Sequence, residues 1–110
     1  MNPSRDQIFL YHILDAIKQI DIYLKKVSVE QFKENRLLID GVVRELEIIG
    51  EAVNNISDEL KDKYSKAPWH KVVGMRNRLI HGYFEVDLDI VWTTCKKELK
   101  ELKQHIAEIK

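Results

Sequence analysis

The sequence has few of the residues that small secreted domains and all-β folds depend on. Its 110 residues include one cysteine, two prolines and four glycines. A single cysteine excludes an internal disulfide and a multi-cysteine zinc site, and so few glycines and prolines cannot supply the turns of an all-β fold. No apolar run approaches the roughly 20 residues of a membrane span, and the N-terminus has no signal-peptide core. These absences predict one domain over residues 1–110, in the cytoplasm and without contact to a membrane.

The chain also has no excess of charge, since 18 Lys and Arg balance 18 Asp and Glu. This balance excludes a generally basic coat protein for nucleic acid and an acidic disordered tail. Counted by segment, however, residues 37–60 carry a net −5 and residues 61–81 a net +5. Basic side chains mixed with aromatic ones in the second segment suit a phosphate backbone and stacked bases. The alternative is charge complementarity between two packed elements of the same domain.

The apolar residues recur at spacings of three and four along most of the chain, which predicts helices. Ser4 with Gln7, and Ser28 with Gln31, have the spacing of capping boxes. Further helices are expected over residues 36–56, 57–64 and 68–82, with Pro68 in the first helical position and Gly82 as the C-cap. A last helix follows Asp87. The sequence therefore predicts an all-α, up-and-down helical bundle.

The last predicted helix is unusually long for so small a domain. Its 24 residues would extend about 36 Å at 1.5 Å per residue. A helix that extends beyond its own core commonly buries the excess against a partner, so a homodimer is expected.

Arg76 occupies an anomalous position in the predicted helix over residues 68–82. At about 100° per residue it falls in the middle of the apolar arc, where a guanidinium must be paired or must face a solvent-filled cleft. His70, Gly74, Asn77 and His81 form a second stripe that is polar but uncharged. Arg76 and His81 point about 140° apart on a straight helix. They can converge if His81 leaves helical geometry at Gly82, or if two copies of the helix face each other.

An arginine and a histidine together suit phosphodiester chemistry. Arg76 can stabilise the charge that grows on phosphate oxygens, and His81 can move a proton near neutral pH. Asn77 can orient the imidazole or hold a phosphate oxygen. Such a site would cleave RNA through its 2′-hydroxyl without a metal or another cofactor.

Two carboxylates, Glu47 and Glu51, lie one turn apart in the predicted third helix. A metal or acid–base pair is one interpretation, but carboxylate metal sites in bundles usually add Glu-x-x-His motifs, and none is present. A counter-charge for the basic segment is favoured, and one of the two carboxylates is a candidate partner for Arg76. His12 and Asp15 share a helix face, but two ligands do not make a metal site.

Three small residues, Gly41, Gly50 and Ala52, mark places where helices are expected to approach closely. Cys95 falls on the apolar stripe of the last helix and is expected in the core. Trp69 is expected to be a packing anchor rather than a platform for bases.

Residues 76–83 resemble the Arg-x4-His-x-Tyr motif of HEPN-domain proteins, specifically the HepT toxin branch. The resemblance extends to other segments in the expected order: Glu47–Ala52, Pro68-Trp69, Gly74–Asn77 and Phe84–Asp87. It covers nearly the whole chain.

The resemblance implies a dimeric helical domain with Arg76 and His81 of both protomers in an interfacial cleft. It implies a metal-independent endoribonuclease, the toxin of a type VII HepT/MNT toxin–antitoxin pair. The partner would be an MNT-type nucleotidyltransferase antitoxin that inhibits the toxin by adenylylating Tyr83. Supporting or RNA-binding positions are expected in the basic segment: His70, Lys71, Asn77 and Arg78.

Two other functions fit the same residues. The domain can be a non-catalytic binding module that docks a nucleotidyltransferase and binds nucleotide or a protein substrate, since a nucleotide phosphate would also require Arg76. It can also be a purely structural dimerisation module, for which Arg76→Met is expected to be neutral or stabilising.

Overall fold

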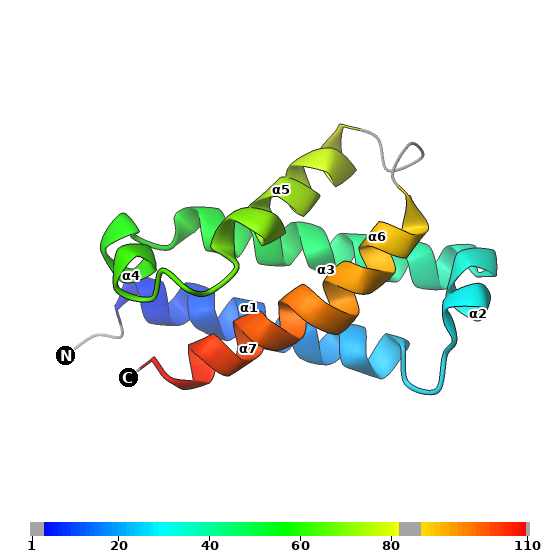
Figure 1. The fold of residues 1–110 in the computed structure, drawn as a ribbon, viewed down its shortest axis with the longest axis horizontal. Coiled ribbons are helices and arrows are strands. Elements are labelled where there is room, and N and C mark those ends of the chain that lie inside the picture. The colour runs from blue at the N-terminus through cyan, green and yellow to red at the C-terminus, as the bar shows by residue number, and fades with distance from the viewer. Residues whose placement is uncertain (1–3, 82–86, 110) are drawn as a thin grey trace.

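A computed structural model describes residues 4–81 and 87–109. These residues form helices and no strand, which confirms the predicted all-α class (Figure 1). In chain order the elements are α1 (Arg5–Tyr23), α2 (Val29–Glu34), α3 (Arg36–Asn55), α4 (Asp58–Lys63), α5 (Trp69–Ile80), α6 (Leu88–Thr93), the π-helical segment η2 (Thr94–Glu98) and α7 (Leu99–Ala107).

Side-chain caps fix where the helices of the first half begin. In both predicted capping boxes, at Ser4 and Ser28, the hydroxyl accepts a hydrogen bond from the backbone N–H of the glutamine three residues later, at 3.1 Å. The start of α3 has a cap that the sequence pattern did not indicate, because the side-chain oxygen of Asn35 accepts from the N–H of Leu38. Ser57 caps α4, and its own N–H and hydroxyl donate to the carboxylate of Asp6. This last contact joins the start of α1 to the start of α4.

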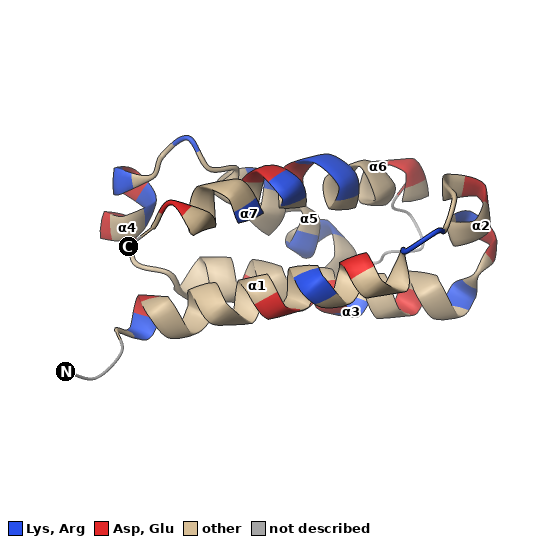
Figure 2. Cartoon of the chain, turned by 90° about the horizontal axis from the view of Figure 1, so that it is seen from below, with Lys and Arg blue, Asp and Glu red and all other residues tan. Residues whose placement is uncertain are grey.

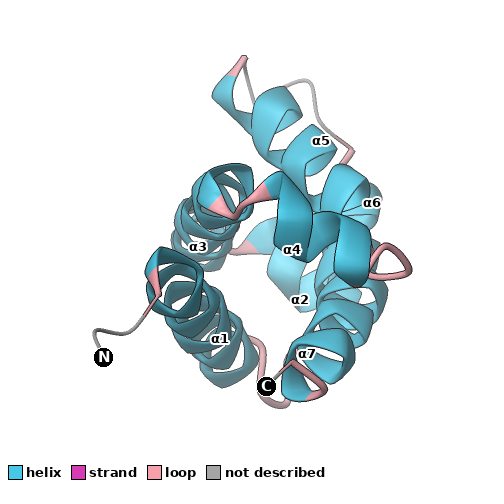
Figure 3. Ribbon diagram, turned by 90° about the vertical axis from the view of Figure 1, so that its left-hand side faces the viewer, coloured by secondary structure: helices cyan, strands magenta, loops and turns pink. Residues whose placement is uncertain are grey.

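The two longest helices, α1 and α3, lie side by side (Figures 1 and 3). Helix α5 packs on α3, and α7 lies beside α1. One continuous core fills the space between them, and its fully buried large side chains come from every long element. They are Ile13, Ile20, Phe32, Val42, Leu46, Ile49, Val53, Val72, Val91, Leu99 and Leu102.

The C-terminal helical run differs from the single regular helix that was predicted. Asp87 caps its start as expected, accepting from the N–H of Asp89 at 2.8 Å. After the six residues of α6 the run widens into η2, where the N–H of Leu99 donates to the carbonyl of Thr94, five residues back. The hydroxyl of Thr94 donates to the carbonyl of Ile90, which also accepts from the backbone N–H of Thr94. Such bonding of a threonine to its own helix perturbs the regular ladder.

The ends of α5 also differ slightly from the prediction. Pro68 is the residue before the helix rather than its first member, because its ψ of 53° is not helical. The helix ends at Ile80 with His81 as its C-cap, and the predicted cap Gly82 lies outside the described residues.

Across residues 4–81 and 87–109, none of the helices combines the length and the apolar character that crossing a bilayer requires.

Candidate active site

Arg76 lies on the packed side of α5, as the phase of the helix predicts. Its neighbours at one-turn spacings, Val72 and Leu79, are buried, and its own side chain is 22% exposed. The guanidinium is therefore largely removed from bulk water, which requires partners for its donors.

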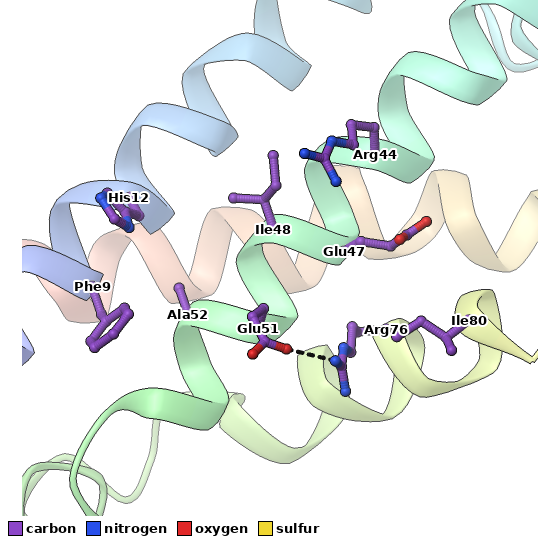
Figure 4. Close-up of a pocket in the computed structure, with 9 residues that line it drawn as sticks. All are labelled: Phe9, His12, Arg44, Glu47, Ile48, Glu51, Ala52, Arg76 and Ile80. Carbon is purple, nitrogen blue, oxygen red and sulfur yellow. Dashed lines mark hydrogen bonds and ion pairs between the residues drawn. The ribbon is translucent and has the colours of Figure 1, made fainter.

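Glu51 on α3 supplies the main partner of Arg76. The Nη2 of Arg76 donates to Oε2 of Glu51 at 2.6 Å, the ion pair drawn in Figure 4. The Nη1 of Arg76 donates to the side-chain oxygen of Asn77 at 3.2 Å. Of the two carboxylates that the sequence left open, Glu51 is the one that pairs with Arg76. On the described part of the chain the Nε of Arg76 is buried and has no hydrogen-bond partner.

A glycine on α3 makes this approach of the two helices possible. A Cβ added at Gly50 would collide with Cβ and Cγ of Arg76. Only a residue without a side chain lets the stem of the arginine lie directly on the backbone of α3. The close approach predicted at Gly50 is confirmed, and so is the one at Gly41, which faces the ring of Tyr23.

A cavity of about 360 Å³ opens in front of the Arg76–Glu51 pair. Three helices line it: α1 with Phe9 and His12, α3 with Arg44, Glu47, Ile48, Glu51 and Ala52, and α5 with Arg76 and Ile80 (Figure 4). The lining joins an apolar wall to two guanidiniums, two carboxylates and one imidazole. Such a cavity can receive an anionic group and present it to Arg76.

His81 does not line this cavity. Its backbone stays in the right-handed helical region, at φ −80° and ψ −2°, and its N–H donates to the carbonyl of Asn77 at 3.3 Å. Because α5 continues in helical geometry through His81, the exposed imidazole projects from a different side of the helix than Arg76. Of the two routes to convergence, a departure from helical geometry at His81 is therefore not observed.

The supporting positions predicted in the basic segment all lie on exposed parts of α5. These are His70, Lys71, Asn77 and Arg78. Of the four, Asn77 contacts Arg76 directly. Tyr83, the predicted modification site, lies outside the described residues.

His12 and Arg44 belong to the cavity, and the sequence reasoning did not place them there. The imidazole of His12 lies edge-on to the ring of Phe9, with centroids 6.0 Å apart. On α1 the only available signal was the spacing of Phe9 and His12, which is close to one helical turn. This spacing places the two residues on one face but cannot show which helix packs opposite. Within the described ranges, no group of three or more His, Cys, Asp or Glu side chains could hold a metal ion.

Away from the cavity, two titratable groups among the described residues have shifted pKa values. Burial raises the pKa of the Cys95 thiol to about 12, so the thiol stays protonated and is not a ready nucleophile. This agrees with the predicted core position of Cys95, which is buried. On α3, burial and the nearby Asp15 raise the pKa of Glu45, against a smaller opposing effect of Arg44.

Comparisons with known proteins agree with the resemblance of residues 76–83. The family model described as "Ribonuclease HepT-like" matches residues 13–109. A protein of Caldanaerobacter subterraneus subsp. tengcongensis named "Putative RNase" is 44% identical over 92% of this chain and 90% of its own length. A Methanocaldococcus jannaschii protein with the same name is 42% identical over 97% of this chain and 89% of its own.

A third relative, from Thermococcus cleftensis, carries the name "Probable ribonuclease HepT" and is 34% identical over 93% of each chain. No solved structure gave a significant match. The family model spans the cavity-forming helices α3 and α5 completely, together with most of α1. The chain therefore belongs to the HepT-like ribonuclease family, and its enzyme class is that of a ribonuclease.

Proposed function

We propose that the protein is a metal-independent endoribonuclease whose active site combines Arg76 of one protomer with His81 of a second. The observation that carries the proposal is the placement of the two residues on α5. Arg76 lies in a cavity with a buried, unpartnered Nε, whereas His81 projects to solvent from another side of the same helix. A two-fold symmetric dimer in which two α5 helices face each other would bring each Arg76 near the partner's His81.

In the proposed reaction a phosphodiester of RNA enters the cavity with its oxygens toward Arg76. An imidazole of His81 removes the proton from the adjacent 2′-hydroxyl, and the 2′-oxygen forms a bond to phosphorus. The bond from phosphorus to the 5′-oxygen breaks, and that oxygen takes up a proton. The products are a 2′,3′-cyclic phosphate and a free 5′-hydroxyl. Arg76 stabilises the charge on the non-bridging oxygens, which is greatest in the transition state.

Glu51 and Asn77 hold Arg76 before substrate arrives. Their contacts fix the guanidinium, whose Nε is buried and has no hydrogen-bond partner among the described residues. A guanidinium fixed in this way loses less freedom when the substrate binds. Glu51 also carries a negative charge at 2.6 Å from Nη2, so the approaching phosphate competes with it for the arginine.

We also propose that the protein is the toxin of a toxin–antitoxin pair whose antitoxin is an MNT-type nucleotidyltransferase. The support is the resemblance of residues 76–83 to the Arg-x4-His-x-Tyr motif. In the inhibitory reaction the hydroxyl of Tyr83 would attack the α-phosphate of ATP and release pyrophosphate. The added AMP would place a bulky anion near a cleft that receives phosphate, and would exclude RNA by size and charge.

The test uses protein expressed without the nucleotidyltransferase and shown by mass to be unmodified at Tyr83. Cleavage of RNA in EDTA is compared among the wild type, Arg76→Ala, His81→Ala and the control His105→Ala, which removes a histidine of α7. We expect losses of about 10²–10⁴-fold for the two site variants and none for the control. Equal cleavage by the wild type and His81→Ala, or no cleavage by the wild type, contradicts the catalytic assignment. The latter result would favour a binding module.

A mixing experiment tests the composite site. Arg76→Ala and His81→Ala proteins are unfolded together, refolded and assayed. A mixed dimer contains one site with an intact Arg76 from one chain and an intact His81 from the other, so activity should return. If the mixture stays as inactive as either variant alone while sedimentation shows mixed dimers, the two residues do not act across an interface.

A further inference from the structure

A second groove lies against α5, away from the Arg76 cavity. It has a volume of about 250 Å³ and is bordered by α5, α6 and η2. Its polar lining residues are Lys71, Arg78, Thr94 and Glu98, and Gly74 contributes bare backbone. None of the nine residues that line the Arg76 cavity takes part in it.

Two cationic side chains follow one side of α5 along this groove. Lys71, Gly74 and Arg78 stand at positions i, i+3 and i+7, which is the spacing of a single helix face. Lys71 and Arg78 are two turns apart, about 10 Å along the axis. Both are exposed, and no hydrogen bond or ion pair within the described residues engages either of them. Figure 2 shows the Lys and Arg positions of α5 in blue.

The residue between the two cations has no side chain. A Cβ added at Gly74 would meet no heavy atom within 4 Å, so nothing in this chain requires glycine there. Glycine in the middle of a helix is nevertheless unfavourable relative to alanine. Exposed backbone between two cations allows a linear polyanion to lie close to the helix.

Glu98, which lines the groove, has one oxygen that accepts no hydrogen bond from the described residues. The Oε2 of Glu98, in η2, is buried and has no hydrogen-bond partner in the described structure. A carboxylate beside a phosphate is unfavourable, so a ligand that approaches the Glu98 carboxylate would do so with a hydrogen-bond donor. In a polynucleotide the available donors are the 2′-hydroxyl of ribose and the amino groups of bases.

We propose that this groove binds a ribonucleotide strand that flanks the cleavage site. Its phosphates contact Lys71 and Arg78, its backbone passes over Gly74, and a 2′-hydroxyl donates to Glu98. Arg78 and His81 are three residues apart and lie on neighbouring positions of the helix surface, so the strand leads toward the imidazole. This inference rests on the proposed ribonuclease function and assigns it a strand-binding subsite that is separate from the Arg76 cavity.

The experiment measures binding of a single-stranded RNA oligonucleotide over a range of salt concentrations. All proteins carry His81→Ala so that the RNA is not cut. The groove variant is Lys71→Gln with Arg78→Gln, and the control is Lys100→Gln with Lys103→Gln on α7, which removes the same charge. Loss of two phosphate contacts should reduce the slope of log affinity against log salt by about 1.4, at about 0.7 per contact for a single strand. The control should keep the slope of the parent.

Two further variants separate the groove from general charge attraction. Gly74→Gln should weaken RNA binding while it raises resistance to urea, because glutamine favours the helix but fills the gap. Glu98→Met should reduce the preference for RNA over DNA of the same sequence. A purely structural role of Gly74 or Glu98 predicts neither result.

Each other outcome contradicts a defined part of the proposal. If the salt slope falls equally in the groove and control variants, or falls in neither, the groove does not bind RNA. That outcome leaves the ribonuclease proposal intact. Unchanged RNA-to-DNA preference in Glu98→Met removes the 2′-hydroxyl contact. If the His81→Ala parent binds no RNA at low salt, the proposed function itself fails together with the groove.

Discussion

The two sides of α5 differ in how closely they pack against the rest of the domain. On the inner side Arg76 is 22% exposed, it lies on the backbone of α3 at Gly50, and Glu51 holds its guanidinium. On the outer side Gly74 and His81 are exposed, and a side chain at Gly74 would meet open space. One helix therefore carries a fixed arginine and an unpacked polar stripe.

This difference would let a small domain divide the proposed reaction between a packed side and an exposed side of one helix. A charge-stabilising group benefits from a fixed position and partial removal from water, because its interactions are then stronger and cost no rearrangement. A group that must reach a second chain or a long substrate needs an open surface. Two glycines mark the distinction, since Gly50 is required by a contact within the chain and Gly74 is not.

Among changes in stability, the largest is expected for Gly50→Ala. The new methyl group would collide with Cβ and Cγ of Arg76, so α3 and α5 must separate. We expect a loss of about 1–3 kcal/mol in the free energy of unfolding, the range of overpacked cores. Urea unfolding measures it, with Gly41→Ala as the control, because the nearest atom there is the edge of the Tyr23 ring at 3.3 Å. Equal stability of the Gly50 variant and the wild type would contradict the close packing.

Gly74→Ala should have the opposite sign. With no atom of the chain within 4 Å of the added Cβ, only the preference of alanine for helix remains. We expect the free energy of unfolding to rise by about 0.5–1 kcal/mol. A decrease would show that the outer side is packed in solution, for instance against a second chain, and measuring the stability as a function of protein concentration would identify that case.

Glu51→Gln should have a smaller effect on stability. The ion pair with Arg76 is short, but the Glu51 side chain is 58% exposed, so solvent screens it. We expect a loss of about 0.5 kcal/mol, within the range of exposed ion pairs. Glu47→Gln is the matched control, since it lines the same cavity without contacting Arg76. If both variants match the wild type in stability and in RNA cleavage, the pair has no role.

The smallest effect should be that of Glu45→Gln, and it should depend on pH. Burial and Asp15 raise the pKa of Glu45 in the folded protein above 4.5. The folded state then holds a proton that the unfolded state has released, so wild-type stability falls as the pH rises through that interval. Glutamine has no charge to bury. Glu45→Gln should therefore be more stable than the wild type at pH 7, and the gain should disappear below pH 4.5.

Thermal unfolding across this pH range tests the expectation, with Glu34→Gln on the exposed end of α2 as the control. A gain at pH 7 that persists at pH 4 would show that glutamine packs better, and would contradict the electrostatic cause.

Local signals in the sequence predicted most of the fold, because helix starts depend on neighbouring residues. The capping boxes at Ser4 and Ser28, the cap at Ser57 and the helix over residues 36–56 depend on contacts within a few positions. The π-helical turn was missed, since a spacing of three and four residues does not show where the hydrogen-bond ladder shifts to five.

Only those features of the site that depend on α5 alone could be predicted from the sequence. Helical phase alone placed Arg76 inward and His70, Asn77 and His81 outward. The choice of Glu51 over Glu47 depends on how α3 and α5 cross, and the presence of His12 depends on how α1 packs across the cavity. Such relations between distant segments leave no periodic signal.

The π-helical segment Thr94–Glu98 has a consequence for the lengths that related chains can have. A π turn corresponds to one residue inserted into an α-helix. Val91, Cys95 and Leu99 are spaced by four and four, and all three are buried across the wider turn. A chain that lacks one residue between positions 94 and 98 could therefore form a regular helix with the same buried face. In an alignment of relatives, a one-residue gap at this place would indicate an unchanged core.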